Sequence, residues 1–260
     1  LGLKIKTTDT HYEVSHGKLA GADITMLEAG DTSAINALLL AAQIPQKTII
    51  RFVPPNYQVQ EVCFFLQKLG VQIEGVGTTT LTVKGKENFN KAISYENSED
   101  PIESMMFISA AIMTRSKLTI TRCPIDFLRL ELEKLKGMGQ KFIISKPYLA
   151  KNGFTELVDL QVIPSKLKAL SDKIHSLPYP GINTDNLPFF VPIATQADGT
   201  TLIHDWMWEN RAIYFTELNR LGANIHLADP HRAFIEGPTK LTGAQVVCPP
   251  ALRPAMIILI

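Results

Sequence analysis

Two side chains in the sequence have types and positions that suit chemistry on an anion, the carboxylate of Asp185 and the guanidinium of Arg211. Asp185 lies in a segment, 180–188, that is dense in turn formers and short polar side chains. An aspartate held in such a loop can act as a general base. The planar fork of an arginine binds a carboxylate or a phosphate through two parallel hydrogen bonds. Asp185 is therefore a candidate catalytic residue, and Arg211 is a candidate anion ligand.

An aspartate at this place has a second interpretation, as the cap of a helix. Asp31, Asp100 and Asp185 each lie nine or ten residues before a phrase of small residues on a predicted helix. Aspartate at a helix N-cap satisfies backbone N–H groups and suits the helix dipole. We expect Asp31 to be a cap, whereas for Asp185 both capping and catalysis stay open. A fourth copy of the pattern has Ala251 here, with Arg253 two residues later.

Arg211 differs in character from the residues at equivalent places in the sequence. Val59, Leu128 and Arg211 each lie ten residues before a Leu-Gly or Met-Gly pair, and only the last of them is charged. A buried arginine needs a partner. Two kinds of partner fit, an anionic substrate group or an internal ion pair with Glu209 or Glu217.

These residues belong to a repeated unit. A phrase of Leu-Gly type ends an apolar-periodic stretch and opens a strand at residues 1–5, 69–73, 138–142 and 221–225. The glycine of each phrase predicts the end of a helix. In the middle of each unit, small residues, a polar turn and a β-branched strand follow one another. The unit reads strand, helix, strand, helix, strand, strand, with copies over 19–85, 88–152 and 158–237.

Composition and charge exclude several classes of protein. The chain has 260 residues, 45% of them hydrophobic and 20% charged, which is typical of a globular protein. A net charge of +1 without a basic stripe argues against nucleic acid as a partner. The cysteines, Cys63, Cys123 and Cys248, have no metal-ligand spacing and predict free thiols in a reducing compartment. No apolar run approaches a membrane span and no leader pattern is visible, so we expect a cytoplasmic protein without a metal.

The two ends of the sequence predict a piece of a longer protein. The chain begins at Leu1 and ends at Ile260 within an apolar stretch that starts at Ala255. A helix that stops there would lack both its cap and its packing partner. We expect residues 1–86 to be the remainder of a first domain and residues 87–260 to be an incomplete second domain.

Six segments carry a resemblance to a known family. They are residues 100–103, 184–185, 196–200, 209–223, 237–244 and 252–253. With the repeat, they make the chain resemble the enolpyruvyl transferases, and most closely the branch of that family that acts on UDP-N-acetylglucosamine. The resemblance covers nearly the whole chain, and its segments after Pro180 are the most specific.

The resemblance implies a fold and a reaction. The fold is of the α/β (α+β) class, an inverse α/β prism built from βαβαββ repeats, in two domains with the active site between them. The reaction transfers the enolpyruvyl group of phosphoenolpyruvate to the 3-hydroxyl of UDP-N-acetylglucosamine and releases phosphate, as in peptidoglycan precursor synthesis. It implies no cofactor, and no nucleic acid, membrane or obligate protein partner.

The resemblance also implies roles for individual residues. Asp185 would be the base and would bind the sugar hydroxyl, and Met207 would contact the nucleotide sugar through its backbone. Arg211 and Arg253 would hold phosphoenolpyruvate. A further pair would support the cleft, namely Asp100 and Glu103.

Departures from the family pattern leave alternatives open. The family's mobile acid loop, with its cysteine or aspartate, precedes the matched segment, so we expect the 260-residue piece alone to be inactive. The uridine-binding stretch corresponds to residues 28–31, and a usual acidic residue is Ala251 here. One alternative is therefore a catalytically inactive repeat-fold protein that binds a nucleotide sugar or a partner. The other is the sister enzyme that acts on shikimate 3-phosphate.

Overall fold

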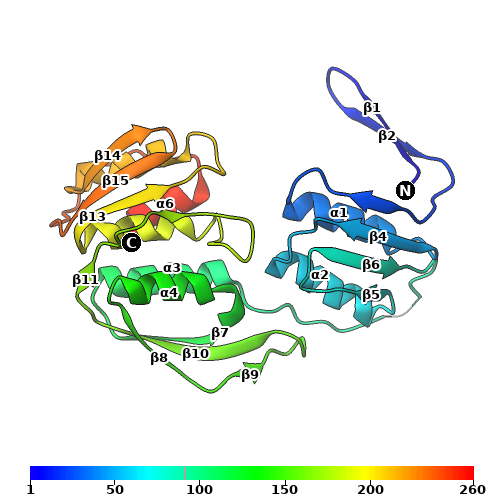
Figure 1. Cartoon of the computed structure of the whole chain (residues 1–260), viewed down its shortest axis with the longest axis horizontal. Helices are drawn as coiled ribbons and strands as arrows, with labels where there is room; N and C mark the ends of the chain where they lie inside the picture. Colours follow the sequence, from blue (N-terminus) through cyan, green and yellow to red (C-terminus); the bar gives the residue numbers. More distant parts are fainter. Residues whose placement is uncertain (91) are drawn as a thin grey trace. The chain divides into compact units, whose positions relative to one another are not determined.

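The computed structural model describes residues 1–90 and 92–260 and forms two compact units, Leu1–Asn97 and Ser98–Ile260 (Figure 1). The domain boundary that the sequence predicts at residue 86 rests on the repeat and stays a prediction. No helix in the described part of the chain is long and apolar enough to cross a membrane.

The first unit consists of a hairpin followed by one complete repeat. Its elements are β1 (Leu3–Thr7), β2 (Tyr12–His16), β3 (Asp23–Thr25), α1 (Asp31–Ala41), β4 (Lys47–Arg51), α2 (Tyr57–Lys68), β5 (Gln72–Glu74) and β6 (Thr80–Lys84). The sheet has the order β3-β4-β6-β5, in which β3 and β4 are parallel and the other pairs are antiparallel. Leu38 of α1 and Val59 of α2 belong to the core that these helices form with the sheet.

The second unit has two repeats and a closing helix. Its helical elements are α3 (Pro101–Met113), η1 (Ile125–Phe127), α4 (Arg129–Gly137), η2 (Leu187–Phe189), α5 (Phe190–Thr195), η3 (Arg211–Leu221) and α6 (Leu252–Leu259). Its strands are β7 (Leu118–Cys123), β8 (Lys141–Ile144), β9 (Tyr148–Leu149), β10 (Glu156–Ile163), β11 (Leu167–Lys168), β12 (Ile174–His175), β13 (Ala197–His204), β14 (Asn224–Asp229) and β15 (Arg232–Gly237).

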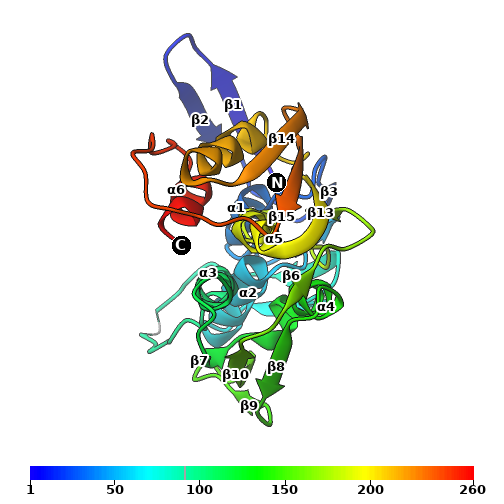
Figure 2. The same cartoon turned by 90° about the vertical axis from the view of Figure 1, so that its left-hand side faces the viewer.

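In this second unit the helices lie inside and the sheets outside. One sheet has the order β7-β10-β8, and the other has the order β11-β13-β15-β14. Helix α3 packs on the first sheet and against α5, which in turn packs on β13 and β15 (Figure 2). Eight of the thirteen residues of α3 are buried, as expected of a helix covered on both sides. This arrangement confirms the predicted fold class.

The order of strands shows where the repeats divide. The sheet orders β3-β4-β6-β5 and β11-β13-β15-β14 have the same pattern of parallel and antiparallel neighbours. The prediction that the third repeat begins at residue 158 is wrong, because β10 pairs antiparallel with both β7 and β8 and closes the second repeat. Residues 88–90 and 92–99 form no strand, so the second repeat lacks its first strand in the described part of the chain.

The glycine that ends each second helix confirms the repeat locally. Gly70, Gly139 and Gly222 follow α2, α4 and η3 with φ of 95°, 95° and 99°. This left-handed conformation suits glycine and ends a helix. At Gly222 a Cβ atom would also lie 2.9 Å from the carbonyl oxygen of Lys240, so a side chain there would strain the turn further.

The aspartates at the predicted helix starts behave differently from one another. Asp100 caps α3, because its Oδ1 accepts a hydrogen bond from the backbone N of Ile102 at 2.8 Å, which confirms that prediction. Asp31 is the first residue of α1 and not its cap, which makes that prediction wrong. Its carboxylate instead accepts a hydrogen bond from Asn56 Nδ2 at 3.0 Å and so joins α1 to the start of α2.

The three thiols are free, and two of them are buried. Burial raises the pKa of Cys63 to about 12 and that of Cys123 to about 11, whereas Cys248 is exposed. Because the thiolate is the reactive form, we expect a disulfide reagent at pH 8 to modify only Cys248 quickly in the folded chain. The other two thiols should react after denaturation. Rapid native modification of a second thiol would contradict the core described above.

Candidate active site

The candidate site forms around the loop 176–186, which joins β12 to η2. Trp206 Nε1 donates a hydrogen bond to the backbone oxygen of Ser176 at 2.7 Å and fixes the start of this loop. At its end, Asp185 is followed by η2, whose N-cap residue is Asn186 without a side-chain cap. The capping interpretation of Asp185 is therefore wrong, and its carboxylate is available for other contacts.

Asp185 lies between two guanidinium groups. Its Oδ1 is 3.7 Å from Nη1 of Arg211, and its Oδ2 is 3.8 Å from Nη2 of Arg253. The side chain is 34% exposed, and among the described residues it accepts no hydrogen bond from another side chain. These contacts are ion pairs at a distance that leaves the carboxylate oxygens open to a ligand hydroxyl.

Arg211 is buried and held by a partner that the sequence did not predict. Its Nε and Nη2 donate to the two carboxylate oxygens of Asp205 at 2.5 and 2.9 Å, a bidentate pair. Its Nη2 also donates to the backbone oxygen of Thr184 at 2.6 Å. The alternative that Arg211 pairs with Glu209 or Glu217 is wrong, because Asp205 at the end of β13 occupies the fork.

Asp205 has a fully buried side chain. Burial raises the pKa of this carboxyl, against the opposing effect of the Arg211 guanidinium. The ring of Trp208 lies 5.7 Å from the Arg211 guanidinium carbon and covers it on one side. Arg211 is thus fixed from within the protein, and its Nη1 is the nitrogen directed at Asp185.

Arg253 reaches the site from α6, which packs against η2 and η3. Its Nε is buried and has no hydrogen-bond partner in the part of the chain that the structure describes. A buried donor without an acceptor is unfavourable, but the Arg253 side chain as a whole is 23% exposed, so part of its guanidinium group is accessible. Together with Arg211, Arg253 makes this end of the second unit suited to binding an anion beside Asp185.

The other predicted site residues make no polar contact with Asp185 among the residues that the structure describes. Asp100 caps α3 and is exposed, and Glu103 is exposed one turn further along. Met207, which Trp206 and Trp208 flank in the sequence, is partly buried. No hydrogen bond or ion pair among the described residues joins these three to Asp185, so their roles stay predictions.

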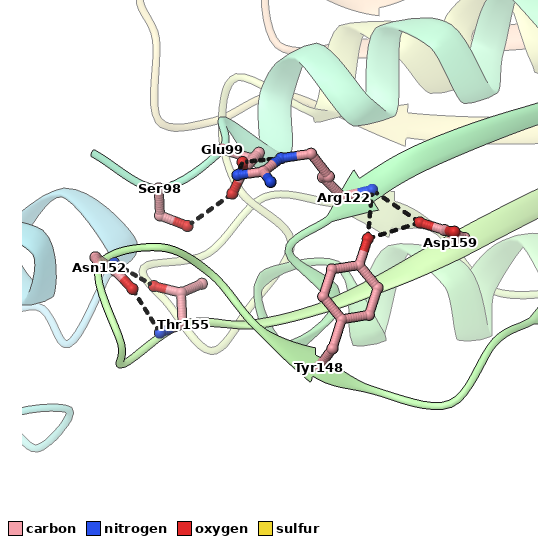
Figure 3. A network of polar contacts seen from close by, with 7 residues as sticks. All are labelled: Ser98, Glu99, Arg122, Tyr148, Asn152, Thr155 and Asp159. Atoms are coloured by element: carbon pink, nitrogen blue, oxygen red, sulfur yellow. Dashed lines mark hydrogen bonds and ion pairs between the residues drawn. The ribbon is translucent and has the colours of Figure 1, made fainter. Parts of the chain in front are cut away.

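A polar network fixes the segment that leads into α3 (Figure 3). Glu99 Oε1 accepts a hydrogen bond from Arg122 Nε at 2.5 Å. The backbone N of Arg122 donates to Tyr148 Oη and to Asp159 Oδ1, each at 3.1 Å, at a bulge of β7 opposite Asp159. Because Glu99 precedes Asp100, this network holds the start of α3 against the sheet β7-β10-β8.

Two buried acids of the site region were missed by sequence reasoning, Asp205 and Glu131. Glu131 lies on α4 and is 2% exposed. Its position, three residues after Leu128 and four before Leu135, places it on the apolar face of the helix, and this was a usable signal. Asp205 directly follows the strand β13, and nothing in the sequence around it indicates that its side chain is buried.

The fold, with the Asp185 carboxylate between Arg211 and Arg253, defines a class of protein, the enolpyruvyl transferases. The structure is similar to the enolpyruvyl transferase NikO from Streptomyces tendae, with a TM-score of 0.81 and 22% identity over 99% of this chain and 61% of that one. It is also similar to EPSP synthase from Acinetobacter baumannii, with a TM-score of 0.75 and 18% identity over 98% of this chain and 60% of that one.

The chain belongs to the EPSP synthase (3-phosphoshikimate 1-carboxyvinyltransferase) family, whose model matches residues 1–260. Relatives named UDP-N-acetylglucosamine 1-carboxyvinyltransferase include those of Treponema denticola, 36% identical over 255 residues, and Bradyrhizobium diazoefficiens, 34% identical over 257 residues. Each alignment covers 96% of this chain, which spans 57% and 56% of the two relatives. The predicted resemblance to the enolpyruvyl transferases is thereby confirmed.

Proposed function

We propose that this chain is part of an enzyme that transfers the enolpyruvyl group of phosphoenolpyruvate to the 3-hydroxyl of UDP-N-acetylglucosamine and releases phosphate. The observation that carries the proposal is the Asp185 carboxylate between the guanidinium groups of Arg211 and Arg253. The names of the relatives support the nucleotide sugar as acceptor over shikimate 3-phosphate. We place the reaction in peptidoglycan precursor synthesis in the cytoplasm.

The reaction is an addition followed by an elimination. The sugar hydroxyl loses its proton and its oxygen bonds to carbon 2 of phosphoenolpyruvate, while a general acid protonates carbon 3. The adduct then loses a proton from carbon 3, the bond from carbon 2 to the phosphate oxygen breaks, and phosphate leaves. The addition needs a base near the hydroxyl, the elimination needs a base near carbon 3, and both need fixed positive charge near the carboxylate and phosphate.

The residues of the site fit these needs. Asp185 is exposed enough to accept a hydrogen bond from the sugar hydroxyl and to take its proton. Arg211, held in place by Asp205, and Arg253, beside Asp185, supply the cationic groups. In this proposal Asp100 and Glu103 support the cleft, Met207 contacts the nucleotide sugar, and residues 87–260 belong to the second domain.

The test is an assay of the product of the complete reading frame that encodes this chain. Phosphate release is followed with phosphoenolpyruvate and UDP-N-acetylglucosamine, with shikimate 3-phosphate as the second acceptor and with no acceptor as the blank. We expect phosphate release when UDP-N-acetylglucosamine is the acceptor, and none with shikimate 3-phosphate or without an acceptor. Release with shikimate 3-phosphate, or none with either acceptor, would refute the proposal.

A further inference from the structure

Glu131 is a buried acid on the apolar face of α4. It shares that face with Leu128, Leu132 and Leu135, all of them buried. Burial raises the pKa of this carboxyl, whereas its hydrogen bonds favour the ionised form. A charged group in such a place is unfavourable unless it is well hydrogen-bonded. Its contacts therefore indicate what it does for the protein.

Those contacts lead to the loop that carries Asp185. Glu131 Oε1 accepts a hydrogen bond from the backbone N of Asn183 at 3.0 Å and another from Asn186 Nδ2 at 2.9 Å. The side chain of Asn183 continues the chain of contacts, because its Oδ1 accepts a hydrogen bond from the backbone N of Asp185 at 2.8 Å. One oxygen atom of α4 thus restrains residues on both sides of Asp185.

This restraint matters because no hydrogen bond among the described residues holds the carboxylate of Asp185. Its partners are guanidinium nitrogens at 3.7 and 3.8 Å, so its position depends on its backbone. Arg211 restrains that backbone on one side through the oxygen of Thr184. Glu131 restrains it on both sides of Asp185, through Asn183 and Asn186.

We propose that Glu131 is a positioning residue for Asp185, which it holds in place through Asn183 and Asn186. The inference rests on the proposed function insofar as Asp185 is the base of the reaction. The restraint on the loop is a physical property of the chain and is measurable without any activity.

The first test compares three variants of the product of the complete reading frame. Glu131→Leu removes the acceptor and should lower kcat about 10- to 100-fold with a change in KM of about threefold or less, because a small displacement of a catalytic group has effects of this size. Glu131→Gln keeps an oxygen that can accept both hydrogen bonds and should retain kcat within about threefold. The control is Glu133→Gln on the same helix, where the side chain is 65% exposed, and it should leave kcat unchanged.

The second test asks whether Glu131 acts through Asp185. In an Asp185→Asn background, Glu131→Leu should cause no further loss of kcat, since residues that act as a unit are not additive. If the decreases in kcat of the two single variants multiplied in the double variant, the inference would be overturned, because Glu131→Leu would then act independently of Asp185. A kcat of Glu131→Leu equal to that of Glu133→Gln would overturn it as well.

Hydrogen exchange separates this inference from the proposed function. The backbone amides of Asn183 and Asp185 should exchange at least about tenfold faster in Glu131→Leu than in Glu133→Gln, while amides of α3 keep their rates. Unchanged exchange at Asn183 and Asp185 would overturn the restraint whatever the enzyme does. If the wild-type protein releases no phosphate, the proposed function fails, and faster exchange still supports the restraint.

Discussion

Asp185→Asn should lower kcat for phosphate release by roughly 10²- to 10⁴-fold, the usual contribution of a general base. The amide cannot take the proton of the sugar hydroxyl, and it also removes the negative charge between Arg211 and Arg253. Stability should change by about 1 kcal/mol or less, because ion pairs of a partly exposed side chain contribute little. The measurement is steady-state phosphate release, with a urea unfolding curve for each protein.

Asp198→Asn is the matched control for this prediction. Asp198 is an exposed aspartate of β13, in the same unit as Asp185. It should leave both kcat and the unfolding midpoint unchanged. If Asp185→Asn retained more than about a tenth of the wild-type kcat, Asp185 would not be the base.

Arg211→Met should destabilise the fold by about 3–5 kcal/mol, the typical effect of removing one partner of a buried ion pair. The variant leaves Asp205 fully buried with no cation in its fork. It also removes the donor that holds the backbone of Thr184, so the loop of Asp185 loses one of its restraints. The free energy of unfolding in urea at pH 7 measures the effect.

The pH dependence of this loss has a definite sign. Burial already raises the pKa of Asp205 in the wild type, so its folded state binds the proton more tightly than the unfolded chain does. Without Arg211 that pKa rises further, and the carboxyl becomes neutral as the pH falls through it. The destabilisation of Arg211→Met should therefore shrink as the pH is lowered toward the ordinary pKa of an aspartate, about 4.

A double variant separates stability from activity. Arg211→Met with Asp205→Leu replaces both charges by apolar groups and should recover most of the lost stability, as other buried ion pairs do. It should not recover phosphate release, because the cation beside Asp185 is still absent. A stability loss below about 1 kcal/mol for Arg211→Met alone would contradict the buried pair described here.

Local features of the fold follow from the sequence more readily than long-range pairings. The glycines after the second helices and the Asp100 cap depend on residues close in the chain, and both predictions are confirmed. The pairing of β10 depends on strands that are distant in the chain. Its alternating pattern is equally compatible with the end of the second repeat and with the start of the third. The repeat boundary was misplaced for that reason.

The same distinction applies to the site. The spacing of the repeats singled out Asp185 and Arg211, and the structure brings them within an ion-pair distance. The nearness of Arg253 came from the resemblance alone, since 68 residues separate it from Asp185 (253 − 185). The predicted partner of Arg211 was wrong because Asp205, which directly follows β13, meets Arg211 at the start of η3 only through the turn that joins the two elements in the folded protein.

Titration calorimetry of UDP-N-acetylglucosamine into the wild-type protein and into Asp185→Ala tests most directly whether this carboxylate contacts the acceptor sugar. We expect the wild type to bind with measurable heat and the variant to bind at least about tenfold more weakly, a difference of about 1.4 kcal/mol. Equal affinities in the two proteins would contradict this expectation.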